Sequence, residues 1–382
     1  MNILTVAPHG LYQDYSASFV HNQAKAYVQQ GHRVRAVIPL AFGKRNDEGK
    51  RFGKIVDIRN VDGVEVCYVR CLSLGGFGAN GFNQKSARIA VKLLMRNILK
   101  DFSADVVHGH TLNVGSELGS IFKKAFACPL VLTTHGGDTN LPYEKGQYEL
   151  LKGYCDCADV VIAVSEKLKA RLESCHTETP VRVIYNGFSV HPDPDSCERD
   201  HKALIQVGNL IPSKRFDVTI RALAKLREEG LDLTLTVIGQ GPLRSELEAL
   251  SAQLGISEFV HFLGRKPNAE VFQKMCESGI FVMASKPEGF GIVYLEAMAA
   301  GCVTVGTEGE GIDGVIENGR NGFLVPADDE DAIVRVVKNV VNDPQLASAV
   351  AMRGKETAQN MTWEQNVCQY EELFGSLQKE HK

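Results

Sequence analysis

The stretch SKPEGFGIVYLEAMAA (Ser285–Ala300) decides the fold, because it joins an apolar strand to a helix through a turn that contains glycines. The run GIFVMA (Gly279–Ala284) predicts the strand, and the helix is expected to begin near Ile292. Gly289 and Gly291 lie in the turn, where a backbone without Cβ lets a ligand approach closely. The free N–H groups and positive dipole end of the helix N-terminus favour an anion such as a diphosphate there.

Two glutamates, Glu288 and Glu296, bracket this turn with seven residues between them. An ionised carboxylate accepts two hydrogen bonds at once, which matches the paired hydroxyls of a sugar or a ribose. The alternative is that Glu296 lies on a helix surface and Glu288 only caps the helix start. The helix is otherwise apolar or small, so it is expected to be buried, and a buried acid without a partner is costly. The pattern therefore favours ligand binding.

Composition describes an ordinary globular protein of 382 residues, 44% apolar and 23% charged, long enough for two or three domains. No run of about 18 uncharged apolar residues is present, so no membrane span is expected. The ten cysteines are scattered and no secretion signal is recognisable, which favours reduced thiols and a cytoplasmic protein.

Charge is unevenly distributed around a net value of −4, which disfavours general nucleic-acid binding. Residues 1–185 hold 23 Lys and Arg against 17 Asp and Glu, and the remainder holds 19 against 29. A basic first half and an acidic second half indicate two lobes that meet different partners.

Alternating apolar runs and helical patterns predict an α/β fold with two Rossmann-like, doubly wound domains facing a central cleft. We expect the first domain at residues 1–187 and the second at 188–362, with a polar, proline-containing linker at His191–His201. The final helix, about 363–382, is expected to pack back on the first domain. Ligands of such sheets bind beyond the carboxyl ends of the strands, so the cleft is the expected site.

The individual elements follow from these patterns. Strands are expected at residues 3–6, 34–38, 64–69, 105–107, 130–133, 160–164, 181–184, 203–208, 233–239, 259–264, 279–284 and 302–306. Helices are expected at about residues 17–30, 84–100, 114–126, 147–157, 166–174 and through most of the chain after 329.

Basic residues follow the first strand of the second domain in NLIPSKR (Asn209–Arg215). Lys214 supplies a point charge suited to a phosphate, and Arg215 adds a second. The later GQGP (Gly239–Pro242) carries only part of a dinucleotide fingerprint, so a nicotinamide cofactor is disfavoured.

Histidines follow two strands of the first domain. His135, in LTTHGGDTN, is placed to face the cleft; the alternative is a histidine bonded to local backbone, with Asp138 capping the turn. His108 and His110 form an HGH run that suggests zinc, but metal sites usually need three or four ligands. We therefore favour a polar strand end without metal.

These motifs resemble the retaining GT-B glycosyltransferases of family four over essentially the full length of the chain. The segment EGFGIVYLE (Glu288–Glu296) is similar to the family motif of two glutamates separated by seven residues. Further similar segments are GNLIPSKRFD (208–217), IGQGPLRSELE (238–248), FLGRKPNAEV (262–271), ENGRNGFLVP (317–326), VIYNGF (183–188) and TTHGGDTNLP (133–142).

The resemblance implies a role for each matching residue. Glu296 would hold the ribose, Glu288 the transferred sugar, and the turn amides with Lys214 the diphosphate, while His135 would lie near the anomeric carbon. The implied donor-binding set is Asn209, Lys214, Arg215, Arg265, Lys266, Glu288, Gly289, Phe290, Gly291, Ile292 and Glu296. The implied catalytic residues are His135, Glu288 and Lys214, and the implied acceptor-side residues are His135, Gly136, Asp138 and Asn186. No cofactor or metal is implied, because basic groups and amides stabilise the leaving diphosphate.

Two positions depart from the family pattern. Many members carry Arg where this chain has Asn209, which weakens one diphosphate contact. Many also place glycines in the first strand–helix turn, where this chain has YSAS (Tyr15–Ser18).

The segment Gln84–Lys100 combines an apolar stripe with five basic residues. It predicts either a helix on an anionic membrane surface or an ordinary helix whose basic face is solvated.

The leading hypothesis is transfer of a hexose from a UDP- or GDP-hexose to a growing cell-surface glycan, such as a lipid-linked oligosaccharide, capsule, O-antigen or exopolysaccharide. The protein is then expected in the cytoplasm or at the inner face of the plasma membrane. A nucleotide-sugar 2-epimerase, which shares the fold, and a non-catalytic subunit, suggested by Asn209, are the alternatives.

Overall fold

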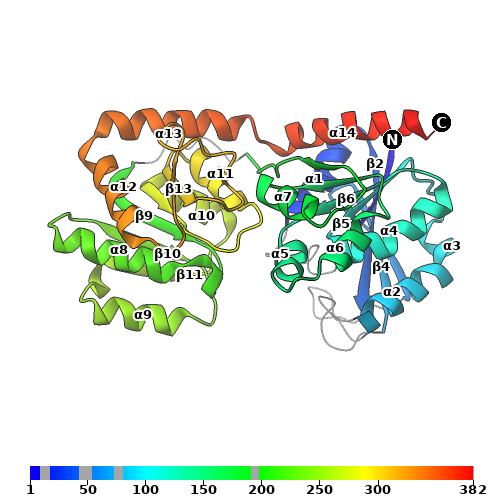
Figure 1. The fold of residues 1–382 in the computed structure, drawn as a ribbon, viewed down its shortest axis with the longest axis horizontal. Coiled ribbons are helices and arrows are strands. Elements are labelled where there is room, and N and C mark those ends of the chain that lie inside the picture. The colour runs from blue at the N-terminus through cyan, green and yellow to red at the C-terminus, as the bar shows by residue number, and fades with distance from the viewer. Residues whose placement is uncertain (9–17, 43–53, 73–80, 191–197, 382) are drawn as a thin grey trace. The chain divides into compact units, whose positions relative to one another are not determined.

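The computed structural model describes residues 1–8, 18–42, 54–72, 81–190 and 198–381. The chain divides into two compact units, each described by itself. The first consists of Met1–Val164, Leu168–Gly187 and Trp363–Lys382, and the second of Ser165–Lys167 and Phe188–Thr362. Both chain ends therefore belong to the first unit (Figure 1).

The first unit is built on an eight-stranded sheet with the order β3-β4-β2-β1-β5-β6-β7-β8. Its neighbouring strands are parallel except for the pair β3 and β4. The strands are β1 (Asn2–Val6), β2 (Arg33–Ala41), β3 (Val56–Val61), β4 (Val64–Cys71), β5 (Val106–His110), β6 (Leu130–Thr134), β7 (Val160–Ala163) and β8 (Val181–Val183).

Helices flank this sheet (Figure 1). They are α1 (Ser18–Gln29), α2 (Gly81–Leu93), α3 (Met95–Ile98), α4 (Leu112–Phe126), α5 (Gly137–Glu144), α6 (Tyr148–Cys155), α7 (Glu166–Glu173) and α14 (Trp363–Glu380). The unit's core is apolar and fully buried at positions such as Leu4, Val107, Leu130 and Phe122.

The antiparallel edge pair β3–β4 was not expected from the sequence, because no strand was predicted between residues 38 and 64. Asp62 and Gly63 connect the strands with φ angles of 51° and 86°, and Val61 pairs with Val64. Two adjacent positive φ angles are typical of a type I′ hairpin turn, for which Asp-Gly is a strong signal. The signal was present in the sequence, and polar residues in β3 obscured it.

The predicted helix Gln84–Lys100 is divided at Leu94 into α2 and α3. Hydrogen bonds from Leu94 N to Ala90 O (2.9 Å) and from Ile98 N to Leu94 O (3.0 Å) cross the division. Because backbone hydrogen bonds from residue i to residue i−4 continue across Leu94, α2 and α3 form one nearly continuous helix.

The C-terminal helix α14 packs within the first unit. The hydroxyl of Tyr370 lies 2.9 Å from Thr133 Oγ1 on β6, and Glu371 Oε1 lies 2.5 Å from His32 Nε2. The ring of Phe374 lies 5.9 Å from that of Tyr27 on α1. These polar and aromatic contacts join the C-terminal helix to α1 and to the sheet of the first unit.

The second unit is built on a six-stranded parallel sheet with the order β11-β10-β9-β12-β13-β14. The strands are β9 (Asp200–Val207), β10 (Thr234–Ile238), β11 (Val260–Gly264), β12 (Ser278–Val282), β13 (Val303–Thr307) and β14 (Phe323–Val325). The helices are η3 (Pro212–Lys214), α8 (Phe216–Glu228), α9 (Arg244–Gln253), η4 (Ser257–Phe259), α10 (Asn268–Glu277), α11 (Ile292–Ala299), α12 (Glu330–Asn342) and α13 (Pro344–Gln359).

Two details of the second unit differ from expectation. The short edge strand β14 was not predicted, and β9 begins at Asp200, inside the segment predicted as a linker. Residues 191–197 of that linker lie outside the described residues.

Each sheet reverses its strand order once, between β1 and β5 in the first unit and between β9 and β12 in the second. At such a switch point the connections leave in opposite directions, which opens a crevice beyond the carboxyl ends of the strands. The fold class is therefore confirmed as two doubly wound parallel sheets, and each unit has one topologically preferred site.

Among the helices that the structure describes, none combines the length and the apolar character needed to cross a membrane.

We predict that Gly239→Ala destabilises the second unit by about 2 kcal/mol or more, as judged by urea or thermal unfolding. Gly239 has a φ of 147°, and an added Cβ would lie 1.8 Å from Gly208 O, so backbone must move. The matched control is Gly375→Ala in α14, where an added Cβ meets no atom within 4 Å. Equal stability of the Gly239 variant and wild type would contradict the close approach of these loops.

Candidate active site

The carboxylate of Glu288 is the centre of a bonded cluster at the switch point of the second sheet. Lys214 Nζ donates to Glu288 Oε2, and so does Ser285 Oγ at 3.2 Å. The backbone N–H of Gly289 donates to Oε1 at 3.1 Å. The side chains of Lys214 and Glu288 keep 20% and 13% of their surface exposed, so a ligand can reach both.

Two loops meet to form this cluster. Lys214 ends the short helix η3 after β9, and Gln206 Nε2 on β9 donates to the Lys214 carbonyl at 2.7 Å. The N–H of Lys286, in the loop after β12, donates to Ser213 O at 2.7 Å. The two loops beyond the switch point are thus joined by backbone as well as by side chains.

Tyr294 and Glu310 support the turn, and sequence reasoning missed both. The buried Tyr294 hydroxyl donates to Met283 O at 2.7 Å and lies 3.1 Å from Ser285 Oγ. The buried carboxylate of Glu310 accepts from the N–H of Glu288 at 2.7 Å. Glu310 follows the next strand, β13, so its place after a strand end was the signal available in the sequence.

The turn itself requires glycine where it passes into α11. Gly291 has a φ of 84°, and an added Cβ would lie 2.6 Å from the ring of Tyr294. Gly311 lies so close that its Cβ would be 2.4 Å from Gly289 O. Gly289 and Phe290 are buried, Gly291 and Ile292 half-buried, and the first turn of α11 carries N–H groups without intrahelical partners. This arrangement suits an anion.

Glu296, one turn into α11, has different surroundings. Its side chain borders a small cavity of about 20 Å³ whose other lining residues come from α10: Asn268, Val271, Phe272 and Met275. The cavity has room for about one water molecule. Burial raises the pKa of the Glu296 carboxyl from 4.5 to about 7. The second glutamate of the motif is therefore a half-buried acid that ionises near neutral pH.

The remaining predicted donor residues follow β9 and β11 of this sheet. Asn209 is exposed two residues after β9. Arg215 places a guanidinium nitrogen 2.7 Å from Asp328 Oδ1. Arg265 and Lys266 lie between β11 and α10, where Lys266 pairs with Glu270 at 3.1 Å.

In the first unit, Asp138 holds the turn that carries His135. Its Oδ1 accepts from the N–H groups of His135 and Gly136, both at 3.1 Å, and from Thr134 Oγ1 at 3.0 Å. Its Oδ2 accepts from the N–H of Leu112, the first residue of α4, at 2.7 Å. Gly136 has a φ of 105°, which favours glycine. Asp138 therefore joins two helix starts at adjacent strand ends.

The imidazole of His135 is half-buried, and burial favours its neutral form. Its Nε2 lies 3.1 Å from Nδ1 of His110, and the ring of Phe19 is centred 4.6 Å away. Burial lowers the pKa of His135 to about 3. Its Nδ1 is buried without a hydrogen-bond partner in the described protein. A buried nitrogen without a partner is a point at which a ligand group gains a hydrogen bond at little cost.

The HGH histidines do not converge on a common centre. His108 Nε2 lies 2.8 Å from Thr133 Oγ1, whereas His110 bonds to His135. Within the described ranges, no three His, Cys, Asp or Glu side chains are arranged to hold a metal ion. Asn186 is buried after β8.

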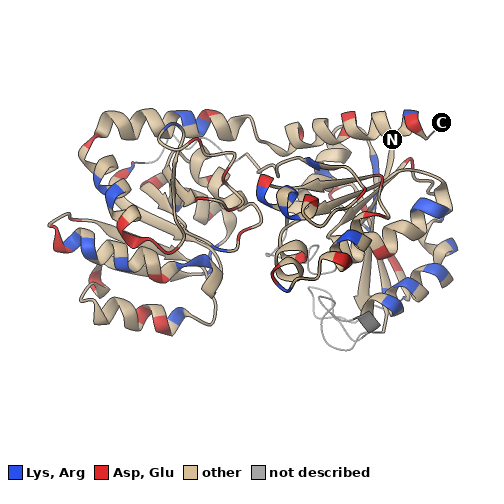
Figure 2. Ribbon diagram, viewed as in Figure 1, with Lys and Arg blue, Asp and Glu red and all other residues tan. Residues whose placement is uncertain are grey.

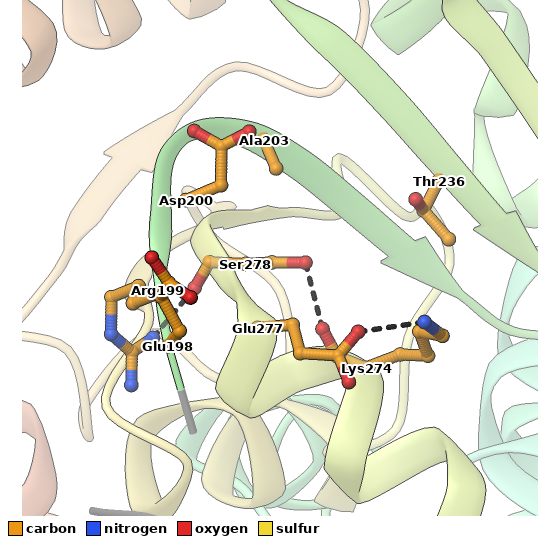
Figure 3. A pocket seen from close by; sticks show the side chains of 8 residues that line it. All are labelled: Glu198, Arg199, Asp200, Ala203, Thr236, Lys274, Glu277 and Ser278. Atoms are coloured by element: carbon orange, nitrogen blue, oxygen red, sulfur yellow. Dashed lines mark hydrogen bonds and ion pairs between the residues drawn. The ribbon is translucent and has the colours of Figure 1, made fainter.

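A separate depression of about 600 Å³ lies at the amino-terminal edge of the second sheet, away from the carboxyl ends (Figure 3). It is lined by Glu198, Arg199, Asp200, Ala203, Thr236, Lys274, Glu277 and Ser278. Lys274 pairs with Glu277 at 2.6 Å, and Arg199 donates to the carbonyls of Ser278 and Ala300, both at 2.6 Å. Because these charges are used within the unit, the depression is not a candidate for the phosphate site.

Comparisons with known proteins agree with this architecture. Residues 16–191 match the model of Glycosyltransferase Family 4, and residues 194–357 match that of Glycosyl transferases group 1. The chain is 30% identical over 280 residues to the GDP-mannose-dependent alpha-(1-6)-phosphatidylinositol monomannoside mannosyltransferase of Mycolicibacterium smegmatis, covering 68% of this chain and 73% of that protein. It is 26% identical over 309 residues to the N-acetyl-alpha-D-glucosaminyl L-malate synthase of Bacillus anthracis, covering 77% and 80%.

Solved structures show the same fold. Sucrose-phosphate synthase from Thermosynechococcus elongatus superposes with a TM-score of 0.78 at 18% identity, covering 99% of both chains. HepE from Anabaena, in complex with UDP-glucose, gives 0.71 at 20% identity, covering 99% of this chain and 100% of that one. The fold is that of the GT-B glycosyltransferases. The chain belongs to glycosyltransferase family 4, which confirms the resemblance found in the sequence.

We predict that Glu296→Gln becomes more stable relative to wild type as the pH rises from 5 to 8. A raised carboxyl pKa means that the folded state binds more protons than the unfolded state between about pH 4.5 and 7, so wild-type stability falls with pH there. The glutamine variant has no carboxyl group to titrate at this position, so its stability does not fall with pH in this way. Urea unfolding at several pH values measures the difference, with the exposed Glu258→Gln as control. A difference independent of pH would show that Glu296 is solvated like a surface acid.

Proposed function

We propose that the protein is a retaining glycosyltransferase that moves a hexose from a nucleoside-diphosphate sugar to a growing cell-surface glycan. The observation that carries the proposal is the contact between Lys214 and Glu288 at the switch point, directly before the N-terminus of α11. It places one cation, one acceptor carboxylate and a row of amide donors around one reachable site. Relatives named for GDP-mannose-dependent transfer and for lipopolysaccharide core biosynthesis support the substrate class.

In this proposal the bound nucleotide sugar replaces hydrogen bonds that the side chains of the site make with one another. The sugar hydroxyls donate to the Glu288 carboxylate in place of Lys214 and Ser285, and Lys214 Nζ turns to a phosphate oxygen. The N–H groups from Gly289 to Ile292 bind the diphosphate. Glu296 accepts from the ribose hydroxyls beside α10, with Arg265 and Lys266 near the base.

The chemical step breaks the bond between the anomeric carbon and the diphosphate oxygen and forms one to the acceptor oxygen on the same face. The acceptor's proton passes to the leaving diphosphate. Lys214 and the amides stabilise the charge that develops there, so the proposal needs no metal or cofactor. A neutral His135 offers its free Nδ1 to the sugar, with Gly136, Asp138 and Asn186 on the acceptor side.

We also propose that α2 and α3 bind an anionic membrane surface that carries the acceptor. Residues 81–100 contain no Asp or Glu, and Figure 2 shows Lys and Arg along both helices. Ile89 and Leu93, one turn apart, are 58% and 79% exposed. The basic residues Lys85, Arg88, Lys92, Arg96 and Lys100 are also exposed. A surface of anionic lipid attracts the basic side chains and accepts the exposed apolar side chains among them.

The donor test is a thermal-shift panel of UDP, GDP, ADP and their hexose conjugates without added metal. We predict that one base series stabilises the protein, by about 2.7 kcal/mol at 100 times its Kd. Lys214→Ala and Glu296→Ala should lose most of the shift, because each removes a donor contact. Glu288→Gln should retain nucleotide binding but lower turnover of the nucleotide sugar sharply.

The exposed Lys202→Ala serves as the control for loss of a cation from the same unit. Unchanged kinetics in the Lys214, Glu288 and Glu296 variants would rule out this site. No shift with any nucleotide would favour a non-catalytic subunit, and isomerised free nucleotide sugar without acceptor would favour an epimerase.

We predict that the protein floats with liposomes containing anionic lipid at low salt and that the double variant Ile89→Ser, Leu93→Ser binds several-fold less. Added salt should weaken binding, because screening reduces attraction to the basic residues. The matched control is Met352→Ser, which removes a 59%-exposed apolar side chain from α13. Absence of flotation at low salt would end the membrane proposal.

A further inference from the structure

We propose that His110 is a positioning residue that fixes the ring orientation and the proton position of His135, so that Nδ1 of His135 is presented to the bound sugar. The inference rests on the proposed function only for the identity of the ligand. The contact between the two histidines is independent of that function.

The two rings are joined by an in-plane hydrogen bond. Nδ1 of His110 and Nε2 of His135 are 3.1 Å apart, the ring centroids are 5.4 Å apart, and the ring planes differ by 18°. The centroid distance equals the nitrogen–nitrogen distance plus the two ring radii, so both nitrogens lie on the line between the centroids. The rings therefore lie edge to edge, which is the geometry of a hydrogen bond.

Proton counting shows that this bond couples the tautomers of the two rings. A neutral imidazole carries one N–H and one lone pair, so only one of the two facing nitrogens can hold the bonding proton. If His110 donates, His135 must carry its own proton on Nδ1, which then donates to the ligand. If His135 donates from Nε2, its Nδ1 is an acceptor. In either case, the position of the proton on His110 determines whether Nδ1 of His135 is a donor or an acceptor.

Burial keeps the pair in this neutral regime. It lowers the pKa of His135 to about 3 and that of His110 well below its usual value. A second proton, which would make both facing nitrogens donors, is therefore disfavoured at neutral pH.

Other neighbours hold the backbone of His135 or pack against its ring, whereas His110 makes the hydrogen bond to a ring nitrogen. Asp138 holds the N–H of His135, and Phe19 packs on the ring. His135 Nδ1 is buried and has no hydrogen-bond partner among the described residues, and a flip of the ring would put the carbon Cδ2 in its place. The bond to His110 opposes that flip.

His110 is itself rigidly placed. It is the last residue of β5 and pairs with Thr133 of β6, and the next N–H, of Thr111, donates to Thr133 O at 2.9 Å. Gly109 packs so closely that an added Cβ would lie 2.6 Å from Leu132 Cδ2. The ring of His108 is centred 4.3 Å from that of His110. These contacts give the HGH run a packing role at the end of β5.

The test compares variants of His110 by nitrogen NMR of protein labelled with ¹⁵N-histidine, with the His135 signals assigned by their loss in His135→Asn. His110→Phe keeps a ring but removes the hydrogen bond. His110→Asn restores a polar atom at the Nδ1 position, whereas His110→Gln places it one bond farther out. We expect one protonated and one unprotonated nitrogen on His135 in wild type and the Asn variant. Averaged signals are expected in the Phe and Gln variants.

A kinetic comparison adds a readout that a purely structural role would not move. With UDP-glucose or GDP-mannose, whichever stabilises the protein, kcat should fall about tenfold in His110→Phe and recover in His110→Asn, as expected for one lost hydrogen bond. The control is His176→Asn, which changes an exposed histidine after α7 and should leave kcat unchanged.

The outcomes separate this inference from the proposed function. Averaged His135 signals in wild type, or unchanged signals in both the Phe and Gln variants, would overturn it. Should His110→Phe fail to fold, the Asn and Gln variants decide alone. A tautomer fixed by His110 in a protein that turns over no nucleotide sugar would support the inference and contradict the proposed function.

Discussion

The meeting of two loops beyond β9 and β12 is the constraint on which the candidate site of the second unit depends. Lys286 N donates to Ser213 O at 2.7 Å, and this bond brings Lys214 against Glu288. Both loops leave from strands that are adjacent only because the sheet order reverses there. A cation and a carboxylate 74 residues apart in sequence thus become one polar site. The glycines around the turn are required because neighbouring backbone and the Tyr294 ring occupy the space of a Cβ.

In the first unit, too, neighbouring strand ends bring together residues that are separated in sequence, but these residues are histidines and not an ion pair. There the strand ends of β5 and β6 bring His110 and His135 together, and Asp138 ties the turn to the start of α4. In this unit burial favours the neutral form of His110 and His135, and Asp138 accepts backbone hydrogen bonds, whereas the second unit presents an ion pair and helix amides. Each unit therefore offers one kind of recognition: neutral hydrogen bonding in the first and charge in the second.

Much of the fold was predictable because period-two and helical patterns repeat along the chain. The errors fell where a pattern was weak. The edge strand β3 is polar, and β14 has three residues, too few to show a period. The residues of the candidate site were predictable in part. Glu288, Glu296 and Lys214 stand in recognisable motifs, whereas Tyr294 and Glu310 act through contacts that no local spacing reveals.

The sequence by itself determined the α/β class, the two domains in tandem and the family, because these depend on local periodicity and on motifs within single strand–helix turns. Only the tertiary structure decided which side chains touch. It paired Lys214 with Glu288, set Glu296 beside α10 and joined His110 to His135. The physical reason is that strand order and loop contact bring distant residues together, and burial then sets their ionisation, which raises the pKa of Glu296 and lowers that of His135.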